Sequence, residues 1–369
     1  MAEPFKNLIG RQQIEQLAER LAAAQPGFRR AAFVRAATTG LEALELKARA
    51  RKVADALEQA LPAEPRKAFA VLIKMMGPPL TATEGYGNTV FTYFPVSEFL
   101  ERHGPRDVEA ALEANYELTR RFSSEFCIRP LILADWATTS KALRRWVKDA
   151  DPHVRRLVSE GTRPRLPWGR QLTNFVADPA PVLPLLEALK DDPSEYVRRS
   201  VSNNLNDISK DHPKQVLELA QRWLVGASRE RRRLVEHALR TLLKRGDPEA
   251  LALIGAGDAK SIAAKGTVTP ARVKRGEKVV LSATVRNRGQ QELHAVVEAR
   301  VHFPRPSGKT SVKPFRLGRV DLAPGEEATL SKGLLMKDRT IRALHAGVHA
   351  VELQVNGVRS PMGQFRLLA

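Results

Sequence analysis

The sequence predicts an all-α HEAT-like repeat solenoid over residues 1–257, followed by a small all-β immunoglobulin-like sandwich over residues 261–369. Two observations support this prediction. First, the phrase Val-Arg-Arg-x-Val-Ser occurs at residues 154–159 and again 43 residues later at 197–202, and this interval matches the period of HEAT-type repeats. Second, the chain beyond about residue 255 alternates between apolar and polar residues in short runs, which is typical of a β-sandwich.

The helices are predicted from apolar spacing and from residues that begin and end helices. Apolar residues recur with a 3.6-residue period over 14–21 and 69–76. Each copy of the repeated phrase follows an Asp-Pro pair, which supplies an N-cap and a first helical residue. Such helix pairs cannot bury their apolar faces alone, so we expect them to stack into a solenoid with a concave surface. Later helices are predicted at 107–126, 138–149, 152–160, 170–177, 181–190, 193–208, 213–224 and 229–245, with another start at Asp247; residues 80–95 are predicted to form a long ordered loop.

The β part is predicted from four runs and the turns between them. The predicted strands include residues 279–285, 295–303, 328–330 and 348–355. Turn signals such as Pro324-Gly325 and Asn356-Gly357 separate these runs at intervals typical of a sandwich. This part contains no cysteine, which excludes the disulfide of antibody domains, so the sandwich is immunoglobulin-like only in the loose sense.

The charge balance predicts a polyanionic partner. The chain has 60 Lys+Arg against 41 Asp+Glu, for a net charge of +19 and a pI near 10.4. Residues 261–369 contain 19 Lys+Arg and 8 Asp+Glu, so this small part has a net charge of +11. A generic basic surface is the alternative, but the clustering favours nucleic acid, with the β part as a second contact.

Other chemical classes find little support. The one cysteine, Cys127, lies in an apolar stretch and is expected to be a small buried hydrophobe. His345 and His349 lack a third ligand, so no metal site is predicted, and no dinucleotide motif or other cofactor signal is present. The N-terminus has no signal-peptide core and no apolar run reaches the ~20 residues of a membrane span. We therefore expect a cytoplasmic, nucleoid-associated protein.

Three carboxylates are the candidates for catalysis. Glu125 is expected to share a helical stripe with Leu118 and Phe122, where it would be partly buried. Glu160 ends the first repeat helix, immediately before a basic loop that contains prolines and a tryptophan, and Asp207 ends the second repeat helix. The alternatives are structural: a surface position for Glu125, a pair with an arginine one turn earlier for Glu160, and a cap for Asp207.

Arginines at repeated positions are candidates for DNA binding. If the second helices of the repeats line the concave face, these arginines form a stripe that can follow a phosphate backbone. The candidates are Arg155, Arg156, Arg163, Arg165, Arg170, Arg198 and Arg199. The alternative is a solvated convex face. Trp168, between a proline and a glycine, is expected either to stack on a nucleotide or to fill the core between repeats.

Two segments carry a resemblance to a known family. Residues 159–168, Ser-Glu-Gly-Thr-Arg-Pro-Arg-Leu-Pro-Trp, residues 203–210, Asn-Asn-Leu-Asn-Asp-Ile-Ser-Lys, and a trailing immunoglobulin-like domain resemble the HEAT-like-repeat alkylpurine DNA glycosylases of the AlkC type. The resemblance implies an active site of three carboxylates, which fall on Glu125, Glu160 and Asp207. It also implies excision of 3-methyladenine and 3-methylcytosine from duplex DNA without swinging the base into a closed pocket, and a β domain that helps to hold the DNA.

The resemblance also suggests a role for each group. Glu160 is expected nearest the sugar and the attacking water, with Glu125 and Asp207 around the cationic base, while Arg156 and Arg163 hold phosphates. Trp168 would pack against the backbone of the lesion. No lysine stands out as a Schiff-base nucleophile, so no lyase activity is expected, and the protein is expected to act on double-stranded DNA as a monomer. The alternatives are a non-catalytic HEAT-repeat scaffold that binds DNA and a repeat protein that binds acidic proteins.

Overall fold

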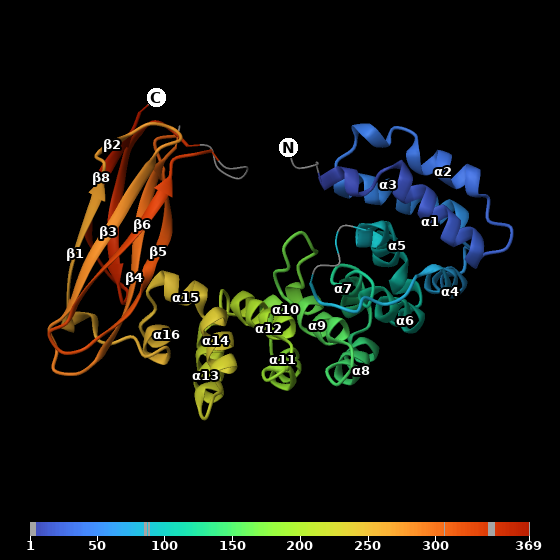
Figure 1. The fold of residues 1–369 in the computed structure, drawn as a ribbon. Coiled ribbons are helices and arrows are strands. Elements are labelled where there is room, and N and C mark those ends of the chain that lie inside the picture. The colour runs from blue at the N-terminus through green and yellow to red at the C-terminus, as the bar shows by residue number, and fades with distance from the viewer. Residues whose placement is uncertain (1–4, 85–86, 88, 306, 339–343, 369) are drawn as a thin grey trace. The chain divides into compact units, whose positions relative to one another are not determined.

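The computed structural model describes residues 5–84, 87, 89–305, 307–338 and 344–368, and it confirms the predicted fold class. Helices occupy the chain up to Leu253, and strands begin at Ile262 (Figure 1). The chain forms two compact units: Met1–His212 with Ala227–Ala238, and Pro213–Gly226 with Leu239–Ala369. Three helices before residue 257 thus belong to the same unit as the sandwich, and the division at 257 and 261 stays a prediction. No helix of the described residues is long and apolar enough to cross a membrane.

The first unit is helical. Its α-helices are α1 (Arg11–Ala24), α2 (Arg30–Thr38), α3 (Leu46–Ala60), α4 (Pro65–Met75), α5 (Phe94–His103), α6 (Val108–Thr119), α7 (Ile128–Ala134), α8 (Trp136–Trp146), α9 (Pro152–Gly161), α10 (Thr173–Ala177), α11 (Leu183–Leu189), α12 (Glu195–Ile208) and α14 (Arg229–Ala238). Short 3₁₀ helices lie at Phe5–Leu8, Leu41–Ala43, Thr89–Tyr93 and Gly104–Arg106. The loop predicted at 80–95 therefore gives way to helix after residue 88; residues 85, 86 and 88 of that prediction lie outside the described residues.

The repeated phrase forms the centre of the stack. Helices α9 and α12, which contain its two copies, pack on each other, and α12 also packs on α14. Val154 and Val197 are fully buried, as the apolar spacing predicts. The Asp151 side chain caps α9 by accepting the main-chain N–H of His153. The second Asp-Pro prediction is wrong in detail, because α12 begins only at Glu195.

One predicted helix is shorter in the structure, and another is divided into two. The helix predicted at 107–126 ends at Thr119, and α7 begins only at Ile128, so Glu125 lies in the turn between α6 and α7. The predicted helical stripe through Leu118, Phe122 and Glu125 is therefore wrong. Serine hydroxyls compete with helical hydrogen bonding here: Ser124 Oγ donates to the carbonyl of Asn115 at 2.8 Å. The helix predicted at 229–245 is divided after Ala238 into two helices, Arg229–Ala238 and Arg240–Arg245.

The second unit combines helices with a two-sheet sandwich. Its helices are α13 (Pro213–Leu224), α15 (Arg240–Arg245) and α16 (Pro248–Leu253), with a 3₁₀ turn at Ala259–Ser261, and Asp247 caps α16 as predicted. Its strands are β1 (Ile262–Thr269), β2 (Arg272–Val273), β3 (Lys278–Asn287), β4 (Leu293–Pro304), β5 (Thr310–Leu322), β6 (Glu327–Leu335), β7 (Gly347–Val355) and β8 (Val358–Leu367). One sheet has the order β1-β3-β6 and the other β2-β8-β7-β4-β5. Alternate residues such as Leu281, Val297 and Leu353 form the buried core between them.

The first arginine in each copy of the repeated phrase makes the same main-chain contacts, but one of the two also forms an ion pair. Arg155 donates through Nη1 to the carbonyls of Asp149 and Ala150, and Arg198 makes the equivalent bonds to the carbonyls of Asp192 and Pro193. Arg155 alone also forms a two-point pair with the Asp192 carboxylate, at 2.6 and 3.0 Å. This pair joins α9 to the start of the next repeat.

The contribution of this ion pair can be measured with a matched control. We expect Arg155→Ala to lower the free energy of unfolding by about 3–5 kcal/mol, because it leaves the Asp192 carboxylate, whose side chain is 4% exposed, without its cation. Arg198→Ala removes the same main-chain hydrogen bonds and should cost only about 1–2 kcal/mol. Urea denaturation measures both, and equal losses would contradict the assignment of the larger effect to the Asp192 pair.

Candidate active site

Three carboxylates from three separate segments are joined by two arginines. Glu125 lies in the turn before α7, Glu160 in the last turn of α9 and Asp207 in the last turn of α12. Arg156 Nη1 lies 2.6 Å from Glu125 Oε2, and its Nη2 lies 3.7 Å from Glu160 Oε1. Arg163 Nη1 lies 2.6 Å from Glu160 Oε1, and its Nε lies 2.8 Å from Asp207 Oδ2. The structure thus brings together the three carboxylates that the sequence singled out.

The sequence around Glu160 allows close packing of the segments that form this cluster. A Cβ at Gly161 would lie 2.6 Å from the Ile128 side chain, so glycine is needed where α7 meets the end of α9. The Asn204 side chain, on α12, donates to the carbonyl of Ser159 at 2.8 Å and thereby fixes α12 against α9. These contacts hold the ends of the two repeat helices together, where their carboxylates lie.

The cluster is largely removed from solvent. The side chain of Asp207 is 2% exposed, that of Glu160 is 7% exposed and that of Glu125 is 16% exposed. Glu160 Oε2 accepts a hydrogen bond from Ser200 Oγ at 2.7 Å, and Asp207 Oδ1 accepts one from Lys210 Nζ at 2.7 Å. Each carboxylate therefore has hydrogen-bond donors on its oxygens, as buried charges require.

The arginines decide the protonation state of Glu160. Burial alone would raise the pKa of Glu160, but the charges of Arg156 and Arg163 and the Ser200 hydroxyl outweigh it and hold that pKa below its ordinary value. Burial likewise opposes the charge of Arg156, and Glu125 and Glu160 overcome it, so the pKa of Arg156 is raised. Glu160 is therefore an anion at neutral pH, and its charge is held by the two arginines.

The loop after Glu160 presents an exposed tryptophan. Trp168 is 75% exposed, which excludes the core position that the sequence left open. Its backbone has a φ of 67°, in the left-handed region that residues other than glycine seldom adopt. Lys47 Nζ, from α3, donates to the carbonyl of Trp168 at 2.7 Å and lies 5.7 and 5.8 Å from the ring centroids of Phe126 and Trp168.

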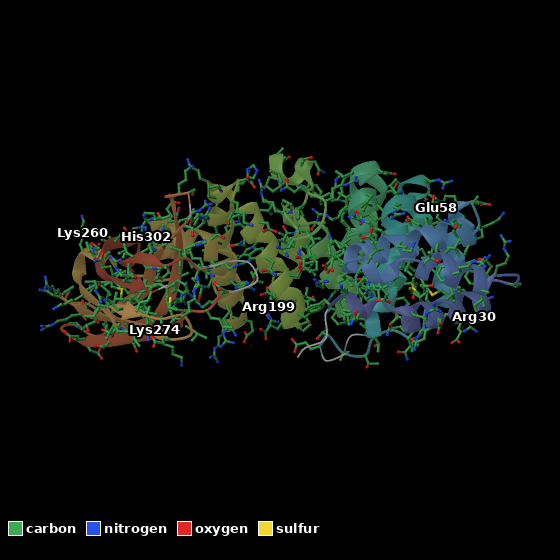
Figure 2. The ribbon with its side chains drawn as sticks, turned by 90° about the horizontal axis from the view of Figure 1, so that it is seen from above. Arg30, Glu58, Arg199, Lys260, Lys274 and His302 are labelled. Atoms are coloured by element: carbon green, nitrogen blue, oxygen red, sulfur yellow. The ribbon has the colours of Figure 1, made fainter. Side chains whose placement is uncertain are left out.

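The remaining predicted arginines fall into two groups. Arg155 and Arg198 hold the main-chain carbonyls described above, and Arg165 pairs with Asp211 at 2.8 Å. Arg170 and Arg199 are exposed, and Figure 2 shows Arg199 on the helical part of the chain. The guanidinium groups of Arg170 and Arg199 are in no ion pair among the described residues, and that of Arg198 contacts main-chain carbonyls but no carboxylate.

Several functional contacts were not predicted from the sequence. Ser200 and Lys210 bind the carboxylates directly, and the Tyr196 ring lies 5.2 Å from the guanidinium carbon of Arg156. The position of Lys210, three residues after Asp207, is a helical spacing from which this contact could have been predicted. Lys47 lies 121 residues from Trp168, and no sequence pattern connects the two.

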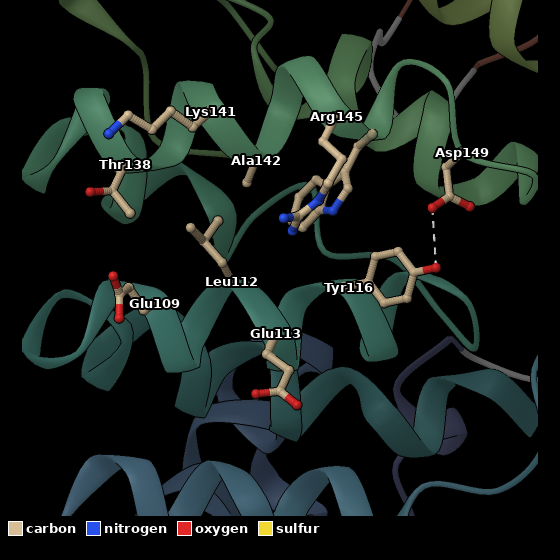
Figure 3. A pocket seen from close by; sticks show the side chains of 10 residues that line it. Glu109, Leu112, Glu113, Tyr116, Thr138, Lys141, Ala142, Arg145 and Asp149 are labelled. Atoms are coloured by element: carbon tan, nitrogen blue, oxygen red, sulfur yellow. Dashed lines mark hydrogen bonds between the residues drawn. The ribbon is translucent and has the colours of Figure 1, made fainter.

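Other candidate groups do not form a site. Cys127 is fully buried, and burial raises its pKa to about 12, as suits a small core residue rather than a nucleophile. The part of the chain that the structure describes contains no group of three or more side chains placed to bind a metal ion. A groove of about 660 Å³ lies between α6 and α8, lined by residues that include Leu112, Tyr116 and Arg145 (Figure 3), and none of the three clustered carboxylates lines it.

Three kinds of comparison with known proteins find similar chains. A family model described as "Uncharacterised protein YhaZ, C-terminal Ig-like domain" matches residues 263–369. "Uncharacterized protein YhaZ" of Bacillus subtilis (strain 168) is 34% identical over 357 residues, which cover 96% of this chain and 96% of that protein. The solved structure "Pseudomonas fluorescens alkylpurine DNA glycosylase AlkC bound to DNA containing an abasic site analog" matches with a TM-score of 0.89 and 31% identity over 100% of both chains.

The low pKa of Glu160 predicts a pH dependence of stability. The pKa of a glutamate in the unfolded chain is about 4.3, and the pKa of Glu160 is lower than its ordinary value in the folded protein. Its contribution to stability is therefore fully present above the unfolded pKa and is lost as the pH falls through the folded pKa.

Between about pH 5 and pH 3, we expect the free energy of unfolding of the wild type to fall more steeply than that of Glu160→Gln. Glu195→Gln, an exposed position on α12, controls for the substitution itself. Urea denaturation at several pH values measures the three proteins. Parallel curves for wild type and Glu160→Gln would show that Glu160 is not held ionised by its neighbours.

Proposed function

The chain belongs to the AlkC-type alkylpurine DNA glycosylases, and from this we propose that it is a monofunctional glycosylase that excises cationic N3-alkylated bases from duplex DNA in base excision repair. The proposed substrates are 3-methyladenine and 3-methylcytosine. The observation that carries the proposal is the cluster of Glu125, Glu160 and Asp207, three carboxylates from separate segments that two arginines hold together.

The chemistry of the substrate explains the use of carboxylates. Alkylation at N3 makes the base cationic, so it is already a good leaving group and needs no general acid. As the glycosidic bond breaks, positive charge develops on the sugar in an oxocarbenium-like transition state. Preorganised carboxylates stabilise that charge without having to reorient. A neutral base would gain much less from the same groups.

Each carboxylate is proposed to have a distinct role. Glu160 would lie nearest the sugar and orient the attacking water. Its carboxylate is fixed by Arg163 and Ser200, and a carboxylate has lone pairs left to accept a hydrogen bond from water. Glu125 and Asp207 would surround the cationic base, and Glu125 has the largest exposed fraction of the three side chains.

Binding to DNA is proposed to use charge and one aromatic side chain. Arg170 and Arg199 are exposed and would contact phosphates, together with Arg156 and Arg163 once DNA is bound. Trp168 would pack against the backbone of the lesion. The net charge of +11 on residues 261–369 supports a second DNA contact on the β part.

Recognition without base flipping is also part of the proposal. The cavities of about 640–670 Å³ on the described part of the chain are lined by other residues than the three carboxylates, so none of these cavities offers a closed pocket at the cluster. The base would instead be recognised by its positive charge while it remains in the duplex. We further propose that the protein acts as a monomer in the cytoplasm, close to the nucleoid.

Release of free base from methylated duplex DNA tests the activity. Under single-turnover conditions we expect the wild type to release 3-methyladenine, and Glu160→Gln to do so about 10²–10³-fold more slowly, because it loses a preorganised charge. Glu195→Gln on α12 should retain the wild-type rate. Chromatography of the released bases measures the rates, and the abasic strand should break only after alkali because no lyase step is expected.

Two outcomes would contradict the proposal. Glu160→Gln that binds DNA normally and excises at the wild-type rate would remove Glu160 from the mechanism. No base release by the wild type, with salt-sensitive DNA binding intact, would support the alternative, a non-catalytic HEAT-repeat scaffold in which the ion pairs of the three carboxylates are purely structural.

Charge selectivity gives an independent prediction. If the carboxylates act on the positive charge of the base, duplexes containing a neutral lesion such as hypoxanthine should show no release above the uncatalysed level. The same chromatographic assay compares hypoxanthine with 3-methyladenine in matched sequences. Comparable release of both would indicate recognition by shape rather than by charge.

A further inference from the structure

Arg129, on α7, is a buried cation that forms no direct ion pair among the described residues. Its side chain is 0% exposed, and the nearest carboxylates, which include Asp207, act on it only at longer range. Its donors instead reach main-chain carbonyls: those of Gly161 at 3.0 Å, Arg163 at 2.8 Å, Pro164 at 3.5 Å and Arg170 at 2.5 Å.

Burial of a guanidinium group outside an ion pair costs free energy, which its hydrogen bonds to carbonyls must offset. Burial, followed by repulsion from Arg163, lowers the pKa of Arg129 to about 10, although the charges of Asp207, Glu101 and Glu125 act in the opposite direction. A buried charge is ordinarily paired with an opposite charge, since desolvation otherwise costs several kcal/mol. Here the acceptors are carbonyls at both ends of the loop formed by residues 161–170, and the planar guanidinium can bind them at once. Arg129 thus links the two ends of this loop through one side chain, an arrangement called the Arg129 clamp below.

The clamp holds the residues on which the carboxylate cluster depends. Arg129 binds the main-chain carbonyl of Arg163, whose own guanidinium group binds Glu160 and Asp207. It also binds the carbonyl of Arg170, two residues after the exposed Trp168. A shift of this loop would therefore move Arg163 relative to the carboxylates.

A second anchor holds the loop from the side of the N-terminal helices. Trp168 has a positive φ, and a strained backbone persists only where its surroundings hold it. Lys47 supplies such a contact through its hydrogen bond to the Trp168 carbonyl. The ammonium group also lies near the faces of the Phe126 and Trp168 rings, where a cation is attracted.

We propose that Arg129 and Lys47 are positioning residues, which hold the 161–170 loop so that Arg163 faces the carboxylates and Trp168 points outward. The proposal rests on the glycosylase function proposed above. Neither residue is placed in contact with the reacting atoms. Their effect passes through the loop, and displacements of about 1 Å in such a supporting segment can reduce a rate by about 10²-fold.

The matched control for Arg129 is a second buried arginine. Arg49, on α3, is 1% exposed and also binds main-chain carbonyls, those of Lys6, Ile9, Leu44 and Glu42, away from the carboxylate cluster; unlike Arg129 it also pairs with an exposed carboxylate, that of Glu42, at 3.3 Å. Arg129→Lys and Arg49→Lys both keep the charge and both lose the planar fork. If Arg129 were only a structural residue, Arg129→Lys and Arg49→Lys would have similar excision rates and similar exposure of Trp168, and they would differ only in stability.

The experiment measures catalysis and loop order separately. The first readout is the single-turnover release of 3-methyladenine at saturating enzyme. The second is acrylamide quenching of Trp168 fluorescence, taken as the difference between each protein and the same protein carrying Trp168→Phe. We expect Arg129→Lys to lower the rate by about 10–100-fold and to increase Trp168 quenching, while Arg49→Lys leaves both at wild-type values.

Lys47 provides a test that does not depend on a buried residue. Lys47→Met should increase Trp168 quenching and lower the rate by about 3–10-fold, because one of the two anchors remains. Lys47→Arg should restore most of both losses, since it keeps a donor and a cation. Lys52→Met, on the same helix, serves as the control for removal of a lysine.

The results separate this proposal from the proposed function. If the wild type releases no base, the glycosylase function fails, while quenching still reports whether Arg129 and Lys47 order the loop. If the wild type releases base and both Arg129→Lys and Lys47→Met match their controls in rate and quenching, the positioning role is overturned. Loss of stability in Arg129→Lys with unchanged rate and quenching would also overturn it.

Discussion

The pairing of two buried carboxylates and one partly buried carboxylate with Arg156 and Arg163 is the interaction on which the rest of this structure depends. A carboxylate transferred from water to a protein interior without a partner is strongly destabilising. Here the charges alternate along a chain that runs from Glu125 through Glu160 to Asp207. The ion pairs connect the turn before α7, the ends of α9 and α12, and the loop between them. The packing of these segments and the assembly of the carboxylate cluster therefore depend on the same contacts.

The same pairs keep Glu160 in its charged form. The arginines and the Ser200 hydroxyl keep Glu160 ionised in a place where burial would favour the neutral acid. They also fix its orientation, because Arg163 holds one carboxylate oxygen and Ser200 holds the other. A carboxylate that is charged and oriented before the substrate arrives need not reorganise as positive charge develops on a sugar. The cluster thus combines a structural and an electrostatic function in the same bonds.

Buried guanidinium groups also hold irregular backbone elsewhere in the first unit. Loops lack the regular hydrogen bonds of helices, so their buried carbonyls need other donors. Arg49 supplies them near the N-terminus and Arg129 supplies them beneath the 161–170 loop. Five N–H donors in one plane allow a single side chain to bind several carbonyls at once. In the second case this leaves the loop rigid enough to present Trp168 to solvent.

The sequence by itself determined the fold class, the repeat and the three carboxylates. The 43-residue interval and the apolar spacing are periodic patterns that can be read directly from the sequence. Tertiary structure decided the rest. Glu125 lies in a turn because serine hydroxyls bind nearby backbone where the apolar pattern suggested helix. Only packing determines that Arg155 binds a neighbouring repeat whereas Arg156, the next residue, binds the carboxylates. Lys47 and Arg129 reach the loop from segments distant in sequence, because long-range contacts follow from how helices stack rather than from any local pattern.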